Sequence, residues 1–250
     1  VSVAWTMFMP DRTVDSTGAM GAGGTVAKSD SKMFAIPQVA LTSKLSDQMA
    51  FGVMAYAMGG MNTDYRTGLA PAAPGGTNGQ SVNLQGMIVA PTLSFAINKD
   101  VSAGASLLVG YTTLTTRNLF GTGAAGTNEG SAVGYGVKLG VDAKVADGIS
   151  VGAMLQPKLN MEEITYFKNF LAGFGFTGDA ALTLPNEVGV GAKFAIGKSV
   201  NVLTDILYYQ WTSVDVLEFF GWEDQIVYKV GAEFRPSENM ALRVGFNYGK

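Results

Sequence analysis

Neither cysteine nor histidine occurs among the 250 residues of the sequence. Their absence excludes disulfides, thiolate metal sites and every catalytic arrangement that needs a thiol or an imidazole. The adjacent acids Glu162 and Glu163 offer no substitute, because neighbouring residues of a strand point to opposite faces and cannot easily share a substrate. We therefore predict that the chain is not an enzyme and carries no cofactor or metal.

Charge is also scarce. Charged residues make up 15% of the sequence, whereas soluble domains carry about 25%. The formal net charge of -3 gives no reason to expect nucleic acid as a partner. With 33 glycines and a mean hydropathy of +0.20, the surface is short of charge for a water-soluble body. This composition favours a surface that is covered by lipid.

Long hydrophobic runs are missing too. No stretch approaches the roughly 18 to 20 apolar residues that a membrane helix needs, because Gly, Ser, Thr or a charge interrupts each run. A closed β-barrel is the other structure that satisfies its backbone hydrogen bonds inside a bilayer.

The sequence instead shows alternation with a period of two. Between Val133 and Val145 every odd position is apolar, and the even positions carry glycine, lysine or aspartate. Side chains alternate across a strand, so one face is apolar and the other polar. We expect the apolar face to meet lipid at Val137, Leu139, Val141, Val190, Phe194, Tyr228, Val230 and Val244. The charges expected in the lumen, as a ladder of ion pairs more than an ion-selectivity device, are Lys138, Asp142, Lys144, Glu187, Lys193, Asp205, Lys229, Glu233 and Arg243.

The spacing of these patterns predicts an all-β fold, a transmembrane antiparallel up-and-down β-barrel. About eleven strands are predicted: 1–9, 34–45, 48–57, 84–98, 101–117, 131–146, 149–166, 180–197, 200–217, 225–235 and 240–250. Tight turns alternate with much longer loops, such as those predicted at 58–83 and 118–130. Short turns on one side and long loops on the other are typical of outer-membrane barrels. Aromatic residues gather near the long-loop ends, where we expect an interfacial girdle: Tyr56, Tyr111, Tyr166, Phe167, Tyr208, Tyr209, Trp211, Phe219, Phe220 and Trp222.

The last two strands carry a more specific signal. Residues 222–234 (WEDQIVYKVGAEF) and 242–250 (LRVGFNYGK) resemble the W-x-D-Q, G-A-E-Y and L-R-x-G-Y-N-Y ending of FadL-type outer-membrane transporters. Residues 184–191 and 208–214 are similar to the preceding strand pair of that family. With weaker matches further upstream, the resemblance spans most of residues 34–250.

The resemblance implies a barrel of about fourteen strands whose lumen is plugged by an N-terminal hatch. Residues 1–250 would then be a single transmembrane barrel domain, with the hatch and about three closing strands outside it. The family's substrates are long-chain fatty acids and other hydrophobic compounds, including aromatic hydrocarbons. Its surroundings are the lipid bilayer and lipopolysaccharide of the bacterial outer membrane. Ligand is captured at an extracellular apolar groove and leaves sideways where the third strand is kinked.

On this basis we assign candidate ligand-binding residues at the outer mouth and near the lateral opening. The mouth residues are Trp211, Phe219, Phe220 and Trp222, and those near the opening are Met58 and Met61. Gly59 and Gly60 are the candidates for the kink itself, although the same stretch also fits an ordinary glycine-rich loop, and the methionines also fit plain packing. A general porin for small polar solutes is the main alternative, since mixed-sign lumen charges suit one. A barrel enzyme or a non-transporting adhesin are more distant alternatives.

Overall fold

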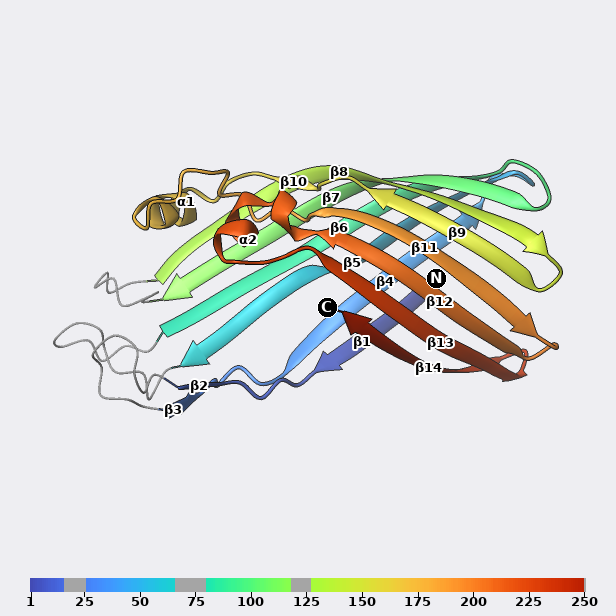
Figure 1. The fold of residues 1–250 in the computed structure, drawn as a ribbon, viewed down its shortest axis with the longest axis horizontal. Helices are drawn as coiled ribbons and strands as arrows, with labels where there is room; N and C mark the ends of the chain where they lie inside the picture. Colours follow the sequence, from blue (N-terminus) through green and yellow to red (C-terminus); the bar gives the residue numbers. More distant parts are fainter. Residues whose placement is uncertain (16–25, 66–79, 118–126, 250) are drawn as a thin grey trace.

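The computed structural model describes residues 1–15, 26–65, 80–117 and 127–249. In this part of the chain, eleven strands form one antiparallel sheet whose spatial order follows the chain order. Their bounds are β1 (Ser2–Phe8), β4 (Phe34–Lys44), β5 (Met49–Tyr65), β6 (Gln80–Ala96), β7 (Val101–Arg117), β8 (Thr127–Ala146), β9 (Ile149–Gln156), β11 (Asn186–Ile196), β12 (Val200–Gln210), β13 (Gln225–Ser237) and β14 (Met240–Gly249). The sheet curls into a wall around a lumen (Figure 1). The predicted all-β antiparallel fold is confirmed.

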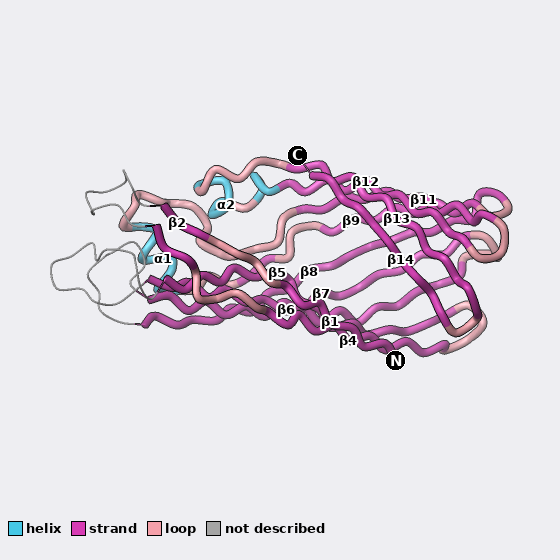
Figure 2. Tube along the Cα trace, turned by 90° about the horizontal axis from the view of Figure 1, so that it is seen from below, coloured by secondary structure: helices cyan, strands magenta, loops and turns pink. Residues whose placement is uncertain are grey.

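The remaining elements lie toward the end of the wall that carries the long connections. They are the β2 (Thr13–Asp15) and β3 (Val26–Lys28) hairpin, the short strand β10 (Asn160–Met161), the helices α1 (Thr165–Ala172) and α2 (Asp215–Phe219), and a 3-10 turn over Trp211–Ser213. Figure 2 shows both helices at this end, opposite the tight turns. No helix in the described residues is long and apolar enough to cross a membrane.

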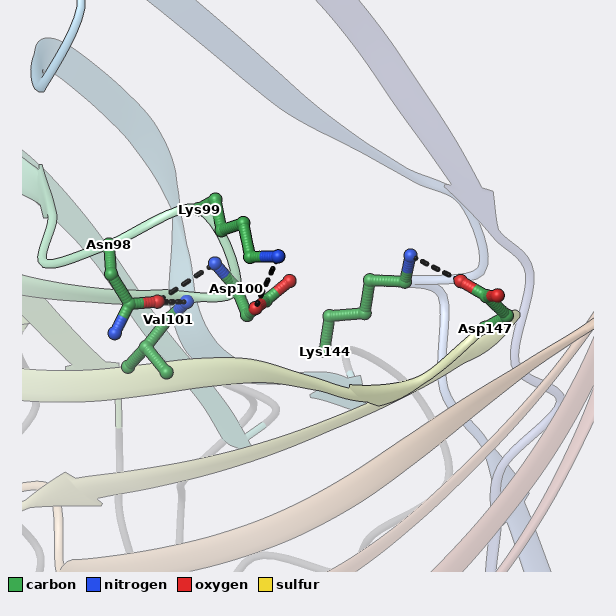
Figure 3. Close-up of polar contacts among 6 residues, drawn as sticks. All are labelled: Asn98, Lys99, Asp100, Val101, Lys144 and Asp147. Carbon is green, nitrogen blue, oxygen red and sulfur yellow. Dashed lines mark hydrogen bonds and ion pairs between the residues drawn. The ribbon is translucent and has the colours of Figure 1, made fainter.

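The tight turns are specified by local side-chain chemistry. The carboxamide oxygen of Asn98 accepts hydrogen bonds from the N–H groups of Asp100 (2.8 Å) and Val101 (2.9 Å), and so closes the turn between β6 and β7 (Figure 3). Asn favours turns because its side chain can bond the backbone two residues on. In the next turn, Lys144 donates to Asp147 at 2.8 Å. Gly148 follows with a φ of 76°, a conformation that glycine adopts without steric cost.

The predicted orientation of the strand faces agrees with the structure. All eight residues expected to face lipid are exposed, from 40% at Phe194 to 74% at Val244. A lumen cavity is lined by Lys138, Asp142, Lys193 and Asp205. Lys229 is the register partner of Asp205 on the neighbouring strand, and partners directly opposite each other share a face.

Three predicted strands are too long. The strand predicted at 149–166 ends at Gln156 in the structure, and the one predicted at 200–217 ends at Gln210. The strand predicted at 180–197 begins only at Asn186. Two of these ends adjoin prolines, Pro157 and Pro185. Proline has no N–H to give to a sheet ladder, so it interrupts pairing. The predicted loop at 58–83 is too long in turn, because β5 and β6 extend into both of its ends.

The wall is therefore uneven in height. Strands β5 to β7 have 17 residues each and β8 has 20, whereas β9 and β11 to β14 have between 8 and 13. The segment 157–185 and the helices occupy the end of the molecule above the shorter strands (Figure 1). The main hydrophobic cluster of the protein forms there.

Candidate functional site

The chain turns into the barrel after β9. From residue 157 it runs along the inner side of β8, where Asn160 and Met161 pair with Tyr135 and Gly134, and we call residues 157–185 the insert. The N–H of Glu162 donates to the carbonyl of Val133 at 2.9 Å. The insert is thus attached to the wall by backbone hydrogen bonds.

Glycines on β7 and β8 make room for the insert. A β-carbon at Gly136 would lie 3.1 Å from the Cα of Leu159, and one at Gly110 would lie 3.0 Å from the side chain of Leu159. A β-carbon at Gly134 would lie 2.8 Å from the Cα of Met161. The structure shows that these glycines allow a second layer of chain inside the wall.

The insert and the wall together enclose an apolar cluster across the long-loop half of the lumen. Its buried members are Ile88, Ala90, Leu108, Leu114, Ala132, Leu159, Met161, Ile164, Phe167, Leu171, Ala180, Ala181 and Val216. Leu108 and Leu159 are fully buried, at 0% exposure. Tyr56 and Met58 of β5 pack against this cluster from one side, and Phe176 of the insert packs against it as well. We call this group the apolar partition.

Strand β5 is irregular where it meets the partition. Ala57 pairs with Met87 and Gly59 pairs with Gly86, so Met58 is an extra residue and forms a β-bulge. The side chain of Met58 lies over Gly86, with its methyl group 2.9 Å from where a β-carbon would stand. A bulge of this kind bends a strand and locally disrupts its ladder.

The pairing between β4 and β5 stops beside this bulge. Its last described pair is Val39 with Ala55, although β5 continues to Tyr65 and β4 begins at Phe34. Residues 34–38 of β4 pair only with β1 in the described structure. Figure 1 shows β5 separating from β4 toward its C-terminal end. The second and third strands of the wall are thus not paired with each other between Ala55 and Asp64, where the backbone of Asp64 bonds Ser29 and Asp30 just before β4.

The predicted mouth aromatics form two groups. Phe219 contacts Phe220 (5.5 Å between ring centroids) and Phe176 of the insert (5.1 Å). Trp211 packs edge-on against Trp222 at 5.1 Å. Because Phe176 also packs against the partition, the first group is joined to the interior and therefore to Met58. Phe219, Phe220 and Trp222 are between 44% and 49% exposed, which leaves them open to a ligand.

Asp224 holds the loop that carries these aromatics. Its carboxylate accepts hydrogen bonds from the Tyr208 hydroxyl and from the N–H (3.0 Å) and hydroxyl (2.8 Å) of Thr212. These donors, the Tyr208 hydroxyl first, lower the pKa of Asp224 below its ordinary value because they stabilise the ionised form. One carboxylate thereby ties both ends of the loop between β12 and β13.

The remaining candidate residues are placed differently from one another. Met58 is partly buried against the partition, whereas Met61, which pairs with Leu84, is 53% exposed. The expected aromatic girdle is wrong in part, because Phe167 is buried in the partition and Tyr56 packs against it. Glu163 accepts hydrogen bonds from Lys168 (2.6 Å) and from the N–H of Ala180 (3.0 Å).

The other half of the lumen carries polar side chains. It holds a cavity of about 610 Å³ lined by Ser, Thr and Gly residues, by charges of both signs and by apolar residues such as Met154 and Leu207. Lys138 pairs with Glu187 at 3.3 Å, and Arg243 pairs with Glu233 at 2.7 Å. These pairs match the expected ladder. Within the described residues, no cluster of three or more acidic side chains could hold a metal ion.

Comparison with known proteins shows which family and which solved structures the chain is similar to. The family model for the outer membrane protein transport proteins (OMPP1/FadL/TodX) matches residues 2–166, more than half of the chain. No curated protein sequence matches this chain. Among solved structures, the toluene transporter TodX of Pseudomonas putida is similar with a TM-score of 0.72 and 17% identity, over 99% of this chain and 73% of that one.

Two further structures are similar over 99% of this chain. The toluene transporter TbuX of Ralstonia pickettii has a TM-score of 0.67 and 16% identity, with 77% of its chain covered. A FadL homologue of Pseudomonas aeruginosa has a TM-score of 0.64 and 14% identity, with 70% of its chain covered. At these identities the structures show a shared barrel fold. Together with the sequence match over residues 2–166, they show that this chain belongs to the FadL/TodX family of bacterial outer-membrane transport proteins.

Proposed function

We propose that residues 1–250 form a single transmembrane domain that conducts hydrophobic molecules by binding and diffusion, with release sideways into the membrane. Capture takes place on Trp211, Phe219, Phe220 and Trp222. The ligand then passes along the apolar partition to Met58 and Met61. It leaves through the wall at Gly59 and Gly60.

The observation that carries this proposal is the loss of pairing between β4 and β5 at the bulge. Unpaired strands are costly in lipid unless something else satisfies their backbone groups, so a stretch of wall without a ladder needs a reason. An opening that lets a ligand enter the bilayer supplies one. The bulge also brings the flexible thioether of Met58 to the same place.

A continuous apolar contact path supports the same route. Phe220 contacts Phe219, Phe219 contacts Phe176, and Phe176 packs against the cluster that Met58 also contacts. Burying apolar surface contributes about 25 cal/mol per Å². A hydrophobic molecule can therefore move between neighbouring apolar surfaces without returning to water.

The substrate class we propose is aromatic hydrocarbons or long-chain fatty acids. TodX and TbuX are toluene transporters, and CymD, another similar structure, is a monoaromatic hydrocarbon channel. Release into the outer membrane would place the bilayer and its lipopolysaccharide in direct contact with the opening.

The polar cavity favours a second function, that of a porin for small polar solutes. Its mixed charges and small side chains resemble the lining of a water-filled pore. The apolar partition opposes this function, because fully buried side chains such as Leu108 and Leu159 stand between the cavity and the mouth.

The test replaces Phe219 and Phe220 together with Ala. Full burial of one aromatic side chain is worth about 1.5 to 3 kcal/mol, and rings that are about half buried contribute about half of that. Each loss should therefore weaken ligand capture about four- to tenfold, measured as the substrate concentration for half-maximal toluene or oleate uptake by cells that express the protein. Phe194 and Phe234 are similarly exposed on the lipid face, and their double replacement with Ala is the control.

Sugar flux in liposomes distinguishes the two functions. We expect slow arabinose entry with the wild type and with both double variants. If arabinose enters fast and the uptake of toluene or oleate is unchanged by the Phe219 and Phe220 replacements, the protein is a porin and our proposal is wrong.

A further inference from the structure

A row of small residues crosses the inner wall from the bulge. Gly59 of β5 pairs with Gly86 of β6, Gly86 pairs with Thr112 of β7, and Thr112 pairs with Ala132 of β8. Partners opposite one another share a face, so the four residues form one row on the lumen face, and its last member, Ala132, belongs to the partition. We call it the small-residue shelf. Small residues alone show only that something packs closely against them.

Thr112 gives the shelf a chemical character. Its side chain is fully buried, at 0% exposure. Its hydroxyl has no hydrogen-bond partner within the described part of the chain. Buried polar groups are nearly always hydrogen-bonded, because leaving one unpaired costs the desolvation of that group. A hydroxyl kept unpaired at this position therefore needs a partner that is absent when the site is empty.

Met58 lies near this hydroxyl. Its methyl group and the Thr112 hydroxyl oxygen approach the same point above Gly86, at 2.9 Å and 3.3 Å from the position of a β-carbon. Above the neighbouring Gly59 a β-carbon would meet no atom within 4 Å. A methionine side chain is unbranched and flexible, and there is open space beside it. Moving it toward Gly59 would uncover both the shelf and the hydroxyl.

We propose that the small-residue shelf is a subsite for neutral hydrophobic molecules that carry one small polar group, with the Thr112 hydroxyl as hydrogen-bond partner and Met58 as cover. The inference rests on the proposed function and specifies its substrate class. A phenolic or alcoholic hydroxyl or a carbonyl matches one unpaired threonine. An ionised carboxylate does not, since a buried charge needs a paired countercharge. Lys138, the first lysine along β8 from Ala132, is already paired with Glu187.

The experiment compares three probes that share a ring system: naphthalene, 1-naphthol and 1-naphthoate. Their dissociation constants are measured by equilibrium dialysis against the full chain in lipid nanodiscs, with empty nanodiscs subtracted. We expect the wild type to prefer 1-naphthol over naphthalene, and 1-naphthoate to bind more weakly than 1-naphthol. Thr112→Val, which keeps the shape and removes the hydroxyl, should lower the preference for 1-naphthol by about three- to tenfold, the size of one net hydrogen bond.

Two further variants separate this role from a structural one. Thr112→Ser keeps a hydroxyl and should keep the preference. Thr116→Val is the matched control, because Thr116 is also buried on the lumen face of β7 but its hydroxyl already bonds Tyr166. We expect it to keep the wild-type preference.

Two results would overturn the inference and leave the proposed function intact: naphthalene binding with an unchanged preference in Thr112→Val, or tighter binding of 1-naphthoate than of 1-naphthol. If the wild type binds neither naphthalene nor 1-naphthol, the proposed function fails together with the inference.

Discussion

Replacing Gly134 with Ala should displace the insert from the wall. The added β-carbon would lie 2.5 Å from the carbonyl oxygen of Asn160 and 2.8 Å from the Cα of Met161. Both contacts are with backbone, which cannot rotate away, so the insert itself must shift. Overpacking of this kind costs about 1 to 3 kcal/mol. A net hydrogen bond is worth about 0.5 to 1.5 kcal/mol, so the strain equals the loss of roughly two of the bonds that tie the insert to β8.

Gly140→Ala is the matched control. Gly140 faces the lumen on the same strand, but its β-carbon would meet only the carbonyl oxygen of Ala153, at an ordinary 3.8 Å. Single-channel conductance, recorded in planar lipid bilayers bathed in KCl solution, measures how readily ions pass through the lumen. We expect low conductance for the wild type and for Gly140→Ala, because the apolar partition excludes hydrated ions. Gly134→Ala should show more frequent conducting events and faster proteolysis within 157–185. Equal conductance of the two variants, at equal amounts of folded barrel, would refute the idea that the insert seals the lumen.

Two further predictions concern the opening and the mouth. Deleting Met58 removes the extra residue of the bulge, so β5 should pair regularly with β6. Uptake of toluene or oleate should then fall at least tenfold, while gel mobility should show that the barrel still resists SDS. Unchanged uptake would place the exit elsewhere. Asp224 has a lowered pKa in the folded state, so its stabilisation of the loop is complete above its ordinary pKa of about 3.9 and is lost as the pH falls through the lowered value. At neutral pH, Asp224→Asn should show the change in Trp211 and Trp222 fluorescence that the wild type shows only in acid. The same change in the control Glu223→Gln would argue against Asp224 as the residue that holds the loop.

The wall could be predicted from the sequence because one rule governs it. Lipid on one side and polar lumen on the other impose strict alternation, as between Val133 and Val145, and almost every strand was placed by it. The bulge at Met58 limits this rule. One extra residue reverses which side chains of β5 face the lumen, so Met61 shares a face with Met58 although alternation counts them as opposite.

The insert escaped prediction for a different reason. Leu159 and Met161 continue the odd-numbered apolar pattern of β9, although they face the partition and not lipid. Alternation does not reveal what covers an apolar face. Pro157 and Pro185 were the available signals, since each removes a donor from a ladder. For the same reason, the mouth aromatics could be named from the sequence, but the links from Phe219 through Phe176 to the interior could not.

The pairing of β10 with β8 bears on how the partition behaves over time. Beyond Leu139 the ladder between β8 and β9 has no further pairs in the described structure, and the edge of β8 would be left with bare amide and carbonyl groups. The insert supplies partners for part of that edge at Gly134, Tyr135 and Val133. Swinging the insert aside would strip those partners away in a place with little water to replace them. The partition therefore stays in place while the protein works. Hydrophobic molecules must pass around it, where the contacts are made by side chains that can change rotamer without breaking the backbone ladder.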